Sequence, residues 1–291
     1  MNKNLHRIYV GLFFVIGISV LVLLAINGYQ YYSTPLEERF FNPQHTMLKP
    51  SGAWGHGFGI IGTLMMIFGV AIYMIRKRFR KLFSFGYLKH WLELHIFLCT
   101  VGPILVLYHT AFKFGGIVSV SFWSMVLVVA SGVVGRFIYV QIPRTIEGQE
   151  LGINAINDLR IDLASKINRS IDFNAQVLNE FRSIASADRY KDLSLGSALA
   201  VFPADFFRIH NVLRKVKKES KVAGIPKVVR KDIVKAAKTE ITLARRIGLL
   251  RTFHKLFRYW HIAHLPFAIT MFVIMIVHVA VTIAFGYKWI F

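Results

Sequence analysis

The chain has 291 residues, of which 55% are hydrophobic and 14% aromatic, and its formal net charge is +21. With a mean hydropathy of +0.49, it is too apolar for an ordinary soluble domain and too interrupted by charge to lie wholly in lipid. We therefore expect an integral membrane protein with one sizeable polar part. The single cysteine, Cys99, excludes a disulfide framework and a thiolate-ligated zinc or iron–sulfur cluster built from this chain alone.

Five apolar runs are long enough to cross a bilayer as helices. A helix needs about 20 residues to cross ~30 Å of hydrocarbon, and helices are expected because unpaired backbone groups are not tolerated in lipid. The predicted spans are residues 8–25, 58–75, 91–112, 117–140 and 260–285. The first run is interpreted as a helix and not a signal peptide, because no Ala-x-Ala cleavage site follows it.

The distribution of Lys and Arg predicts the topology. These residues precede the first span, join the second to the third and follow the fourth, whereas the other loops carry few of them. We expect a bacterial-type inner (cytoplasmic) membrane protein with its N-terminus inside and its C-terminus outside. His95 and His264 would then lie near the inner surface, with His109, His278 and His56 near the outer one.

The polar part falls between the fourth and fifth spans. We divide the chain into four spans (1–140), a cytoplasmic basic helical domain (141–258) and a fifth span that completes the bundle (259–291). The basic domain has 23 Lys/Arg against 12 Asp/Glu, and apolar residues recur at helical spacing from Ile153 to Ile167. Residues 228–258 contain no proline or paired glycine, so we expect one helix that continues into the fifth span.

The basic clusters of this domain, such as residues 214–218, have no interleaved aromatic residues or known binding module, so nucleic acid is not expected. Anionic lipid is the preferred partner for them, and an acidic protein is the second choice.

Two pairs of histidines lie in the third and fifth spans with the same spacing. His95 and His109 are fourteen residues apart, as are His264 and His278. On a helix this spacing is about 21 Å and close to four turns, so both members of a pair face nearly the same way. A single buried histidine is often a packing residue, but four at membrane depth indicate a site. Two such helices could hold two haem b groups, each between two imidazoles, with Gly102 leaving room for the macrocycles.

Several other residues have a functional and a simpler interpretation. Arg136 and Lys113 are candidates to bind haem propionates, although either could instead be a snorkelling residue at a helix end. His56, among alternating glycines, could bind a quinone, relay a proton or replace a ligand of the outer haem, or it could be an interfacial histidine. His90 and Glu93 could carry protons or bond to a ligand, or simply belong to a solvated helix start.

On these features the chain resembles the transmembrane di-haem b cytochromes, of both the cytochrome b and the ferric-reductase-like types. The resemblance covers roughly residues 54–287 and depends on His95-x13-His109 with Gly102, and on His264-x13-His278. It implies low-spin b haems, the inner one ligated by His95 and His264 and the outer one by His109 and His278. Electrons would pass across the bilayer between a quinol pool or redox partner and an acceptor on the other side.

The resemblance is not complete, because residues 141–258 lack the glycine-rich turn of a nucleotide-binding domain. We therefore do not expect NADPH to reduce this chain directly. An electron-transfer subunit of a larger oxidoreductase is implied, with partners such as a soluble or periplasmic cytochrome or an iron–sulfur protein. The alternative from a different class is a haem-free transporter or channel whose histidines line a proton path.

Overall fold

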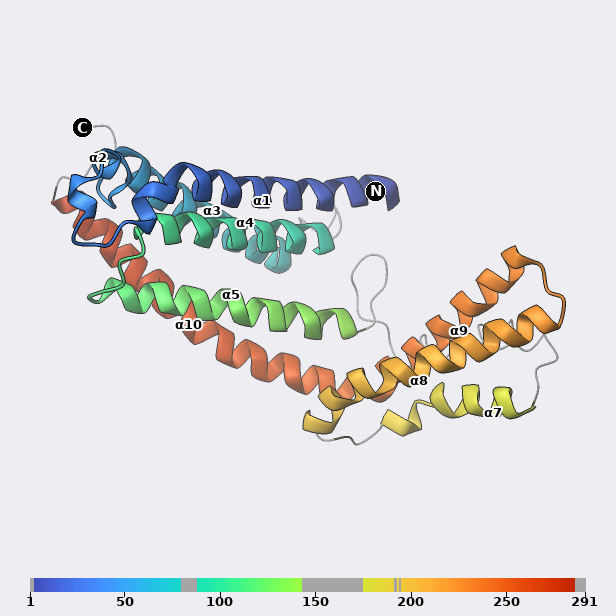
Figure 1. Cartoon of the computed structure of the whole chain (residues 1–291). Coiled ribbons are helices and arrows are strands. Elements are labelled where there is room, and N and C mark those ends of the chain that lie inside the picture. The colour runs from blue at the N-terminus through green and yellow to red at the C-terminus, as the bar shows by residue number, and fades with distance from the viewer. Residues whose placement is uncertain (1–2, 80–87, 143–174, 191–192, 194, 286–291) are drawn as a thin grey trace. The chain divides into compact units, whose positions relative to one another are not determined.

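The computed structural model describes residues 3–79, 88–142, 175–190, 193 and 195–285 (Figure 1). Every element in these ranges is a helix. Five helices are long and apolar enough to cross a membrane, which confirms the prediction of an all-helical, multi-pass membrane protein. They are α1 (Lys3–Ser33), α3 (Ala53–Arg78), α4 (Leu88–His109), α5 (Val118–Gln141) and α10 (Leu250–Ala284).

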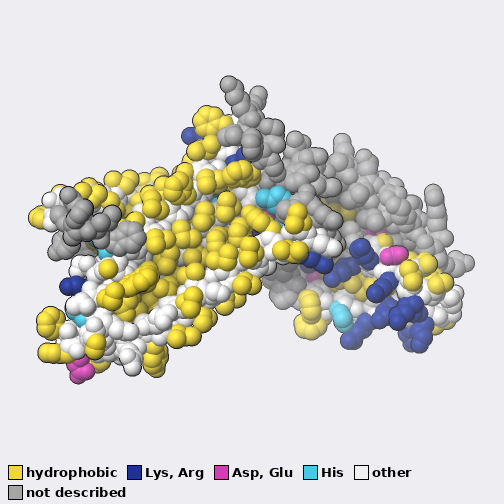
Figure 2. Space-filling model, turned by 90° about the horizontal axis from the view of Figure 1, so that it is seen from above, with side chains coloured by type: hydrophobic (Ala, Val, Ile, Leu, Met, Phe, Trp, Pro, Cys, Tyr) yellow, Lys and Arg dark blue, Asp and Glu magenta, His cyan; other side chains and the backbone are white. Residues whose placement is uncertain are grey.

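The chain divides into two compact units, and the shorter helices are distributed between these units. The membrane unit comprises Met1–Val133 and Ile262–Phe291, and the basic unit comprises Val134–His261. The remaining described elements are η1 (Arg39–Phe41), α2 (His45–Leu48), α7 (Ala175–Ile184), η3 (Asp188–Tyr190), α8 (Leu195–Val222) and α9 (Lys227–Gly248). Figure 2 shows apolar side chains covering the visible face of the membrane unit and Lys and Arg gathered on the basic unit.

Helix α1 packs along α4 in the membrane unit. The rings of Phe13 and Phe97 stack with their centroids 4.4 Å apart. One turn further on, Gly17 faces Val101, and a methyl group at Gly17 would make an ordinary van der Waals contact with the valine side chain at 3.7 Å. Large apolar side chains elsewhere on α1 are exposed, as expected for a helix that faces lipid.

A buried arginine joins two segments of the membrane unit through hydrogen bonds. Arg39 is only 5% exposed, and its guanidinium donates hydrogen bonds to three backbone carbonyls, those of Tyr32, Thr34 and Ala111. The chain leaves α4 through two residues in the left-handed region, Ala111 (φ 48°) and Phe112 (φ 59°). Arg39 therefore ties the end of α1 to the turn that follows α4.

The basic unit has a core of its own. Helices α7, α8 and α9 bury one apolar face each, and the core residues are Phe181, Ile184, Ala185, Val212, Val216, Ile233, Ala237 and Ile241. Their outward faces carry the basic residues visible in Figure 2. The helical apolar pattern expected from Ile153 to Ile167 lies outside the described residues.

The prediction of one continuous helix from residue 228 into the fifth span was wrong. Helix α9 ends at Gly248 and α10 begins at Leu250. Leu249 between them is fully buried, and a side chain at Gly248 would collide with Tyr190 and the carbonyl of Ala187. The break thus results from packing against η3, far away in sequence, which the local sequence does not reveal.

Candidate functional site

Helices α3 and α4 run antiparallel in one register that repeats every seven residues. His109 Nδ1 lies 2.8 Å from the carbonyl oxygen of Gly55, and His95 Nδ1 lies 3.0 Å from that of Gly69. Midway between these contacts, Gly62 faces Gly102. Both predicted ligands on α4 are therefore held by backbone oxygens of α3, fourteen residues apart on each helix.

The glycines at these positions are needed for the close approach of the two helices. A methyl group at Gly62 would lie 2.6 Å from the carbonyl oxygen of Gly102, and one at Gly102 would lie 2.7 Å from that of Gly62. At Gly59 a methyl group would lie 2.8 Å from His109 Nδ1. The space at Gly102, which was expected to accommodate a macrocycle edge, is filled by α3 in this structure.

The hydrogen bonds of His95 and His109 fix which nitrogen of each ring carries the proton. A carbonyl oxygen only accepts, so the Nδ1–H groups of His95 and His109 donate to it. His264 Nδ1 lies 2.6 Å from Ser131 Oγ. The same hydroxyl lies 2.9 Å from the carbonyl oxygen of Val128, and because a hydroxyl and an imidazole nitrogen can each donate or accept, the contact with Ser131 orients His264 without fixing its tautomer.

Two of the four predicted ligands, His95 and His109, thus share one tautomer, with the lone pair on Nε2. This is the form in which histidine binds a metal through Nε2, and an acceptor on Nδ1 is the usual means of orienting such a ring. The orienting groups come from different helices: α3 holds the histidines of α4, and α5 holds His264 of α10 through Ser131.

The rings of His109 and His278 approach each other between α4 and α10. Their centroids are 6.4 Å apart. Imidazole nitrogens bind first-row metals at about 2.0–2.1 Å, so two rings on opposite sides of one metal have centroids about 6 Å apart. The His109–His278 pair therefore has the spacing of two axial ligands to one metal.

His56 also reaches this level, as the sequence predicts. Its ring centroid lies 6.3 Å from that of His109, so α3, α4 and α10 each contribute one imidazole. His56 and His278 differ in what surrounds them, because α3 packs directly on α4 whereas, among the described residues, α10 has little close backbone contact with α4 or α5.

The other predicted pair is not in direct contact. The rings of His95 and His264, which both lie in described helices, make no ring contact with each other like that of the His109–His278 pair. His95 has the ring of Tyr73 as a neighbour, with centroids 5.3 Å apart, and Cys99 Sγ lies 3.6 Å from its Nδ1. Both histidines are nevertheless oriented by hydrogen bonds from a neighbouring helix.

An apolar layer fills the membrane unit between the two levels. Met271, midway between His264 and His278, is 5% exposed and belongs to a cluster with Met66, Phe122 and Met125. Most of α10 is otherwise little covered by protein, since only 6% of its most apolar window is buried. Contacts from lipid or from a bound cofactor would complete the packing of this helix.

Neither of the two predicted propionate-binding cations contacts the four histidines among the described residues. Lys113 is exposed in the turn after α4. Arg136 belongs to the basic unit, where its guanidinium lies 5.7 Å from the centroid of the Tyr139 ring. Their roles therefore stay predictions.

Sequence reasoning missed the groups that orient the imidazoles. Ser131 was not singled out in the sequence, yet it bonds to His264. Gly55 and Gly69 were not paired with the histidines, although Gly55, Gly62 and Gly69 have the same seven-residue spacing as His95, Gly102 and His109. This matched spacing in two adjacent spans is a signal that could have identified the register.

No family model, curated protein sequence or solved structure matches this chain.

Proposed function

We propose that this chain is a membrane di-haem b cytochrome that relays electrons across the bilayer. His109 and His278 would ligate one haem, and His95 and His264 the other. The observation that supports this best is the shared tautomer of His95 and His109, which leaves Nε2 available on both predicted ligands of α4. His264 is oriented in the same way, through a contact of its Nδ1 with Ser131.

Two further features agree with haem between α4 and α10. The 6.4 Å separation of the His109 and His278 rings matches two ligands on one metal. Helix α10 carries its histidines on a face that is not closely packed on α4, whereas the direct packing of α3 on α4 leaves no space for a macrocycle between those helices. His278 is therefore preferred over His56 as the partner of His109.

The four histidines determine which chemistry the proposed haems would supply. A haem b held by one pair of these histidines would supply single-electron transfer, and with both imidazoles bound it would not be suited to activating oxygen. The protein would hold each ring in one orientation through Gly55, Gly69 and Ser131, and its apolar layer would keep water away from the path between the two levels.

By the positive-inside rule, the His95–His264 pair would lie toward the cytoplasm and the His109–His278 pair toward the outside. The donor or acceptor would be a quinone pool or another redox subunit, with a periplasmic cytochrome or an iron–sulfur protein as candidates. The basic unit, rich in Lys and Arg, would face anionic lipid or an acidic partner.

The proposal is tested on purified protein from haem-replete cells. A dithionite-reduced spectrum should show low-spin b-type α bands, and the pyridine haemochrome should correspond to about two haems per chain, as required by four axial imidazoles. A colourless preparation would contradict the proposal. It would favour the haem-free transporter or channel, for which the adjacent rings of His56, His109 and His278 would form the proton path.

A further inference from the structure

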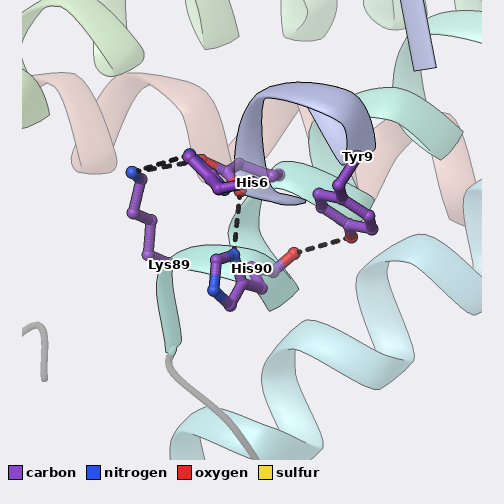
Figure 3. A network of polar contacts seen from close by, with 5 residues as sticks. His6, Tyr9, Lys89 and His90 are labelled. Atoms are coloured by element: carbon purple, nitrogen blue, oxygen red, sulfur yellow. Dashed lines mark hydrogen bonds and ion pairs between the residues drawn. The ribbon is translucent and has the colours of Figure 1, made fainter. Parts of the chain in front are cut away.

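A second histidine cluster lies at the opposite end of α4 from His109. His6 in the first turns of α1 meets His90 and Glu93 in the first turns of α4. Figure 3 shows His6 and His90 side by side. One ligand atom from each residue lies within 4.8 Å of the other two, and all three residues are partly buried. The sequence assigns no role to His6 and only an ambiguous one to the other two residues.

The distances within this cluster suit a metal ion. His6 Nε2 lies 3.5 Å from Glu93 Oε1, and His90 Nδ1 lies 3.2 Å from Glu93 Oε2. Donor atoms that share one metal at about 2.0–2.2 Å lie about 3–3.5 Å from each other, and two histidines with one carboxylate form a common zinc ligand set. The side chain of Glu93 is only 10% exposed, and a carboxylate so little hydrated needs a cation beside it.

In this structure the cation beside Glu93 is the ammonium group of Lys89. Lys89 Nζ lies 2.9 Å from His6 Nε2 and 3.7 Å from Glu93 Oε1. Because an ammonium group only donates, His6 Nε2 accepts and carries the lone pair. The ammonium therefore lies where the lone pair of an imidazole and a carboxylate oxygen converge (Figure 3).

Lys89 does not satisfy all the polar groups of this cluster, and it is not held firmly in place. Its side chain is 47% exposed, so it can withdraw into solvent. The remaining nitrogen of His6, Nδ1, is buried without a hydrogen-bond partner among the described residues, so no acceptor commits the ring to its present tautomer. A divalent ion would satisfy the carboxylate and both imidazoles together, which one ammonium does not.

We propose that His6, His90 and Glu93 bind a divalent transition-metal ion, with zinc as the ion to test and Lys89 as its intramolecular competitor. Three protein ligands would leave a position for water or an exogenous ligand. The ion would fasten α1 to the start of α4, next to the aromatic contact of His6 with His90, whose ring centroids are 5.1 Å apart. This site does not depend on haem, so it can exist whether or not the proposed function is correct.

The experiment measures zinc bound by the full chain, purified in detergent without a histidine tag and stripped with EDTA. Equilibrium dialysis at buffered free Zn²⁺, with metal measured by mass spectrometry, should give about one saturable zinc per chain that the triple variant His6→Ala/His90→Ala/Glu93→Gln lacks. Each single substitution should weaken zinc binding at least about 10-fold, because ligand loss should cost no less than the 10–100-fold known for supporting groups. His210→Ala, which changes an exposed histidine on α8, is the matched control and should bind zinc like the wild type.

A gain-of-affinity variant keeps the test decisive if a ligand variant fails to fold. Lys89→Met should bind zinc more tightly than the wild type, because it removes the competing ammonium and leaves all three ligands. Equal zinc binding by the wild type and the folded triple variant would overturn the proposal, as would unchanged or weaker binding by Lys89→Met. Haem content measured on the same samples tests the proposed function separately, since a wild-type protein that contains haem but binds no zinc refutes only the metal site.

Discussion

Gly62 and Gly102 face each other where α3 crosses α4, and a methyl group at either one would lie within 2.7 Å of the other's carbonyl oxygen. This contact is the midpoint between the two hydrogen bonds that hold His95 and His109. The spacing of the helices at the glycine pair therefore controls the geometry of both predicted ligands on α4.

Gly62→Ala should destabilise the protein by about 1–3 kcal/mol, the usual cost of overpacking a tight contact. It should also lower the haem content at both levels, because α3 would be pushed away from the two histidines. Thermal unfolding followed by circular dichroism, together with the pyridine haemochrome, measures both effects.

Gly132→Ala is the matched control, because nothing lies within 4 Å of a methyl group at this helical glycine. It should unfold at the wild-type temperature or slightly above it, since alanine favours a helix over glycine. Equal stability of Gly62→Ala and Gly132→Ala would show that the glycine contact does not limit the helix spacing.

His278→Ala should reduce the haem content from two to one per chain, whereas His56→Ala should leave both haems in place. The two histidines differ because α3 is packed directly on α4 and α10 is not, although each ring is near His109. The pyridine haemochrome of each purified variant measures the result. Loss of one haem in His56→Ala with retention of both in His278→Ala would reverse the ligand assignment.

Ser131→Ala should alter only the haem ligated by His95 and His264. Without the hydroxyl, His264 Nδ1 loses this hydrogen-bond partner at 2.6 Å, and loss of such a supporting group typically costs 10–100-fold in metal-site affinity. A redox titration of the α bands should show a shifted potential for one haem and an unchanged potential for the other.

Two further substitutions on α5 are controls for Ser131→Ala. Ser131→Thr keeps a hydroxyl and should restore the wild-type titration, and Ser119→Ala removes an exposed hydroxyl that bonds only within its own turn. Identical shifts of both haems in Ser131→Ala would indicate a general distortion, and the specific role of Ser131 would then be wrong.

The stability of the basic unit should fall at high pH. Burial raises the pKa of Tyr190 above its ordinary value of 10.0, and the hydrogen bond and charge of Asp205 raise it further. The folded chain therefore retains a proton that the unfolded chain loses, so stability is fully present below pH 10 and declines as pH rises above it. The decline can reach about 1.4 kcal/mol per pH unit.

Tyr190→Phe should lack this component of the pH dependence. It should also be about 1–3 kcal/mol less stable at neutral pH, because Asp205, 1% exposed, loses the hydroxyl that donates to it at 2.7 Å. Tyr259→Phe, at an exposed position, is the control. Thermal unfolding between pH 8 and pH 11 compares the three proteins, and parallel curves for all of them would contradict the prediction.

The sequence was sufficient to predict the five membrane-spanning helices, because long apolar runs have few alternatives in lipid. It also placed His56 at the level of His109 and His278, since alternating span directions set depth without any knowledge of packing. The break at Leu249 was missed for the opposite reason, because burial against Tyr190 is a tertiary effect that local periodicity does not contain.

The partners of side chains were harder to predict than their depth. Gly102 was expected to face a cofactor, but it faces Gly62, because a helical pattern gives the spacing along one helix and not which neighbour covers each face. Ser131 and His264 lie 133 positions apart in the sequence, so no local pattern connects them. The meeting of His6 with Glu93 likewise depends on which spans become neighbours.

The arrangement of the ligand-bearing helices has a consequence for biogenesis. The hairpin of α3 and α4 orients two imidazoles by contacts within itself, so this half of the proposed haem site can form early in translation. The opposing half is synthesised only after the whole basic unit has left the ribosome. A nascent chain arrested before α10 would therefore contain only the His95 and His109 half of the proposed haem sites. Haem would then be inserted when α10 packs into the bundle.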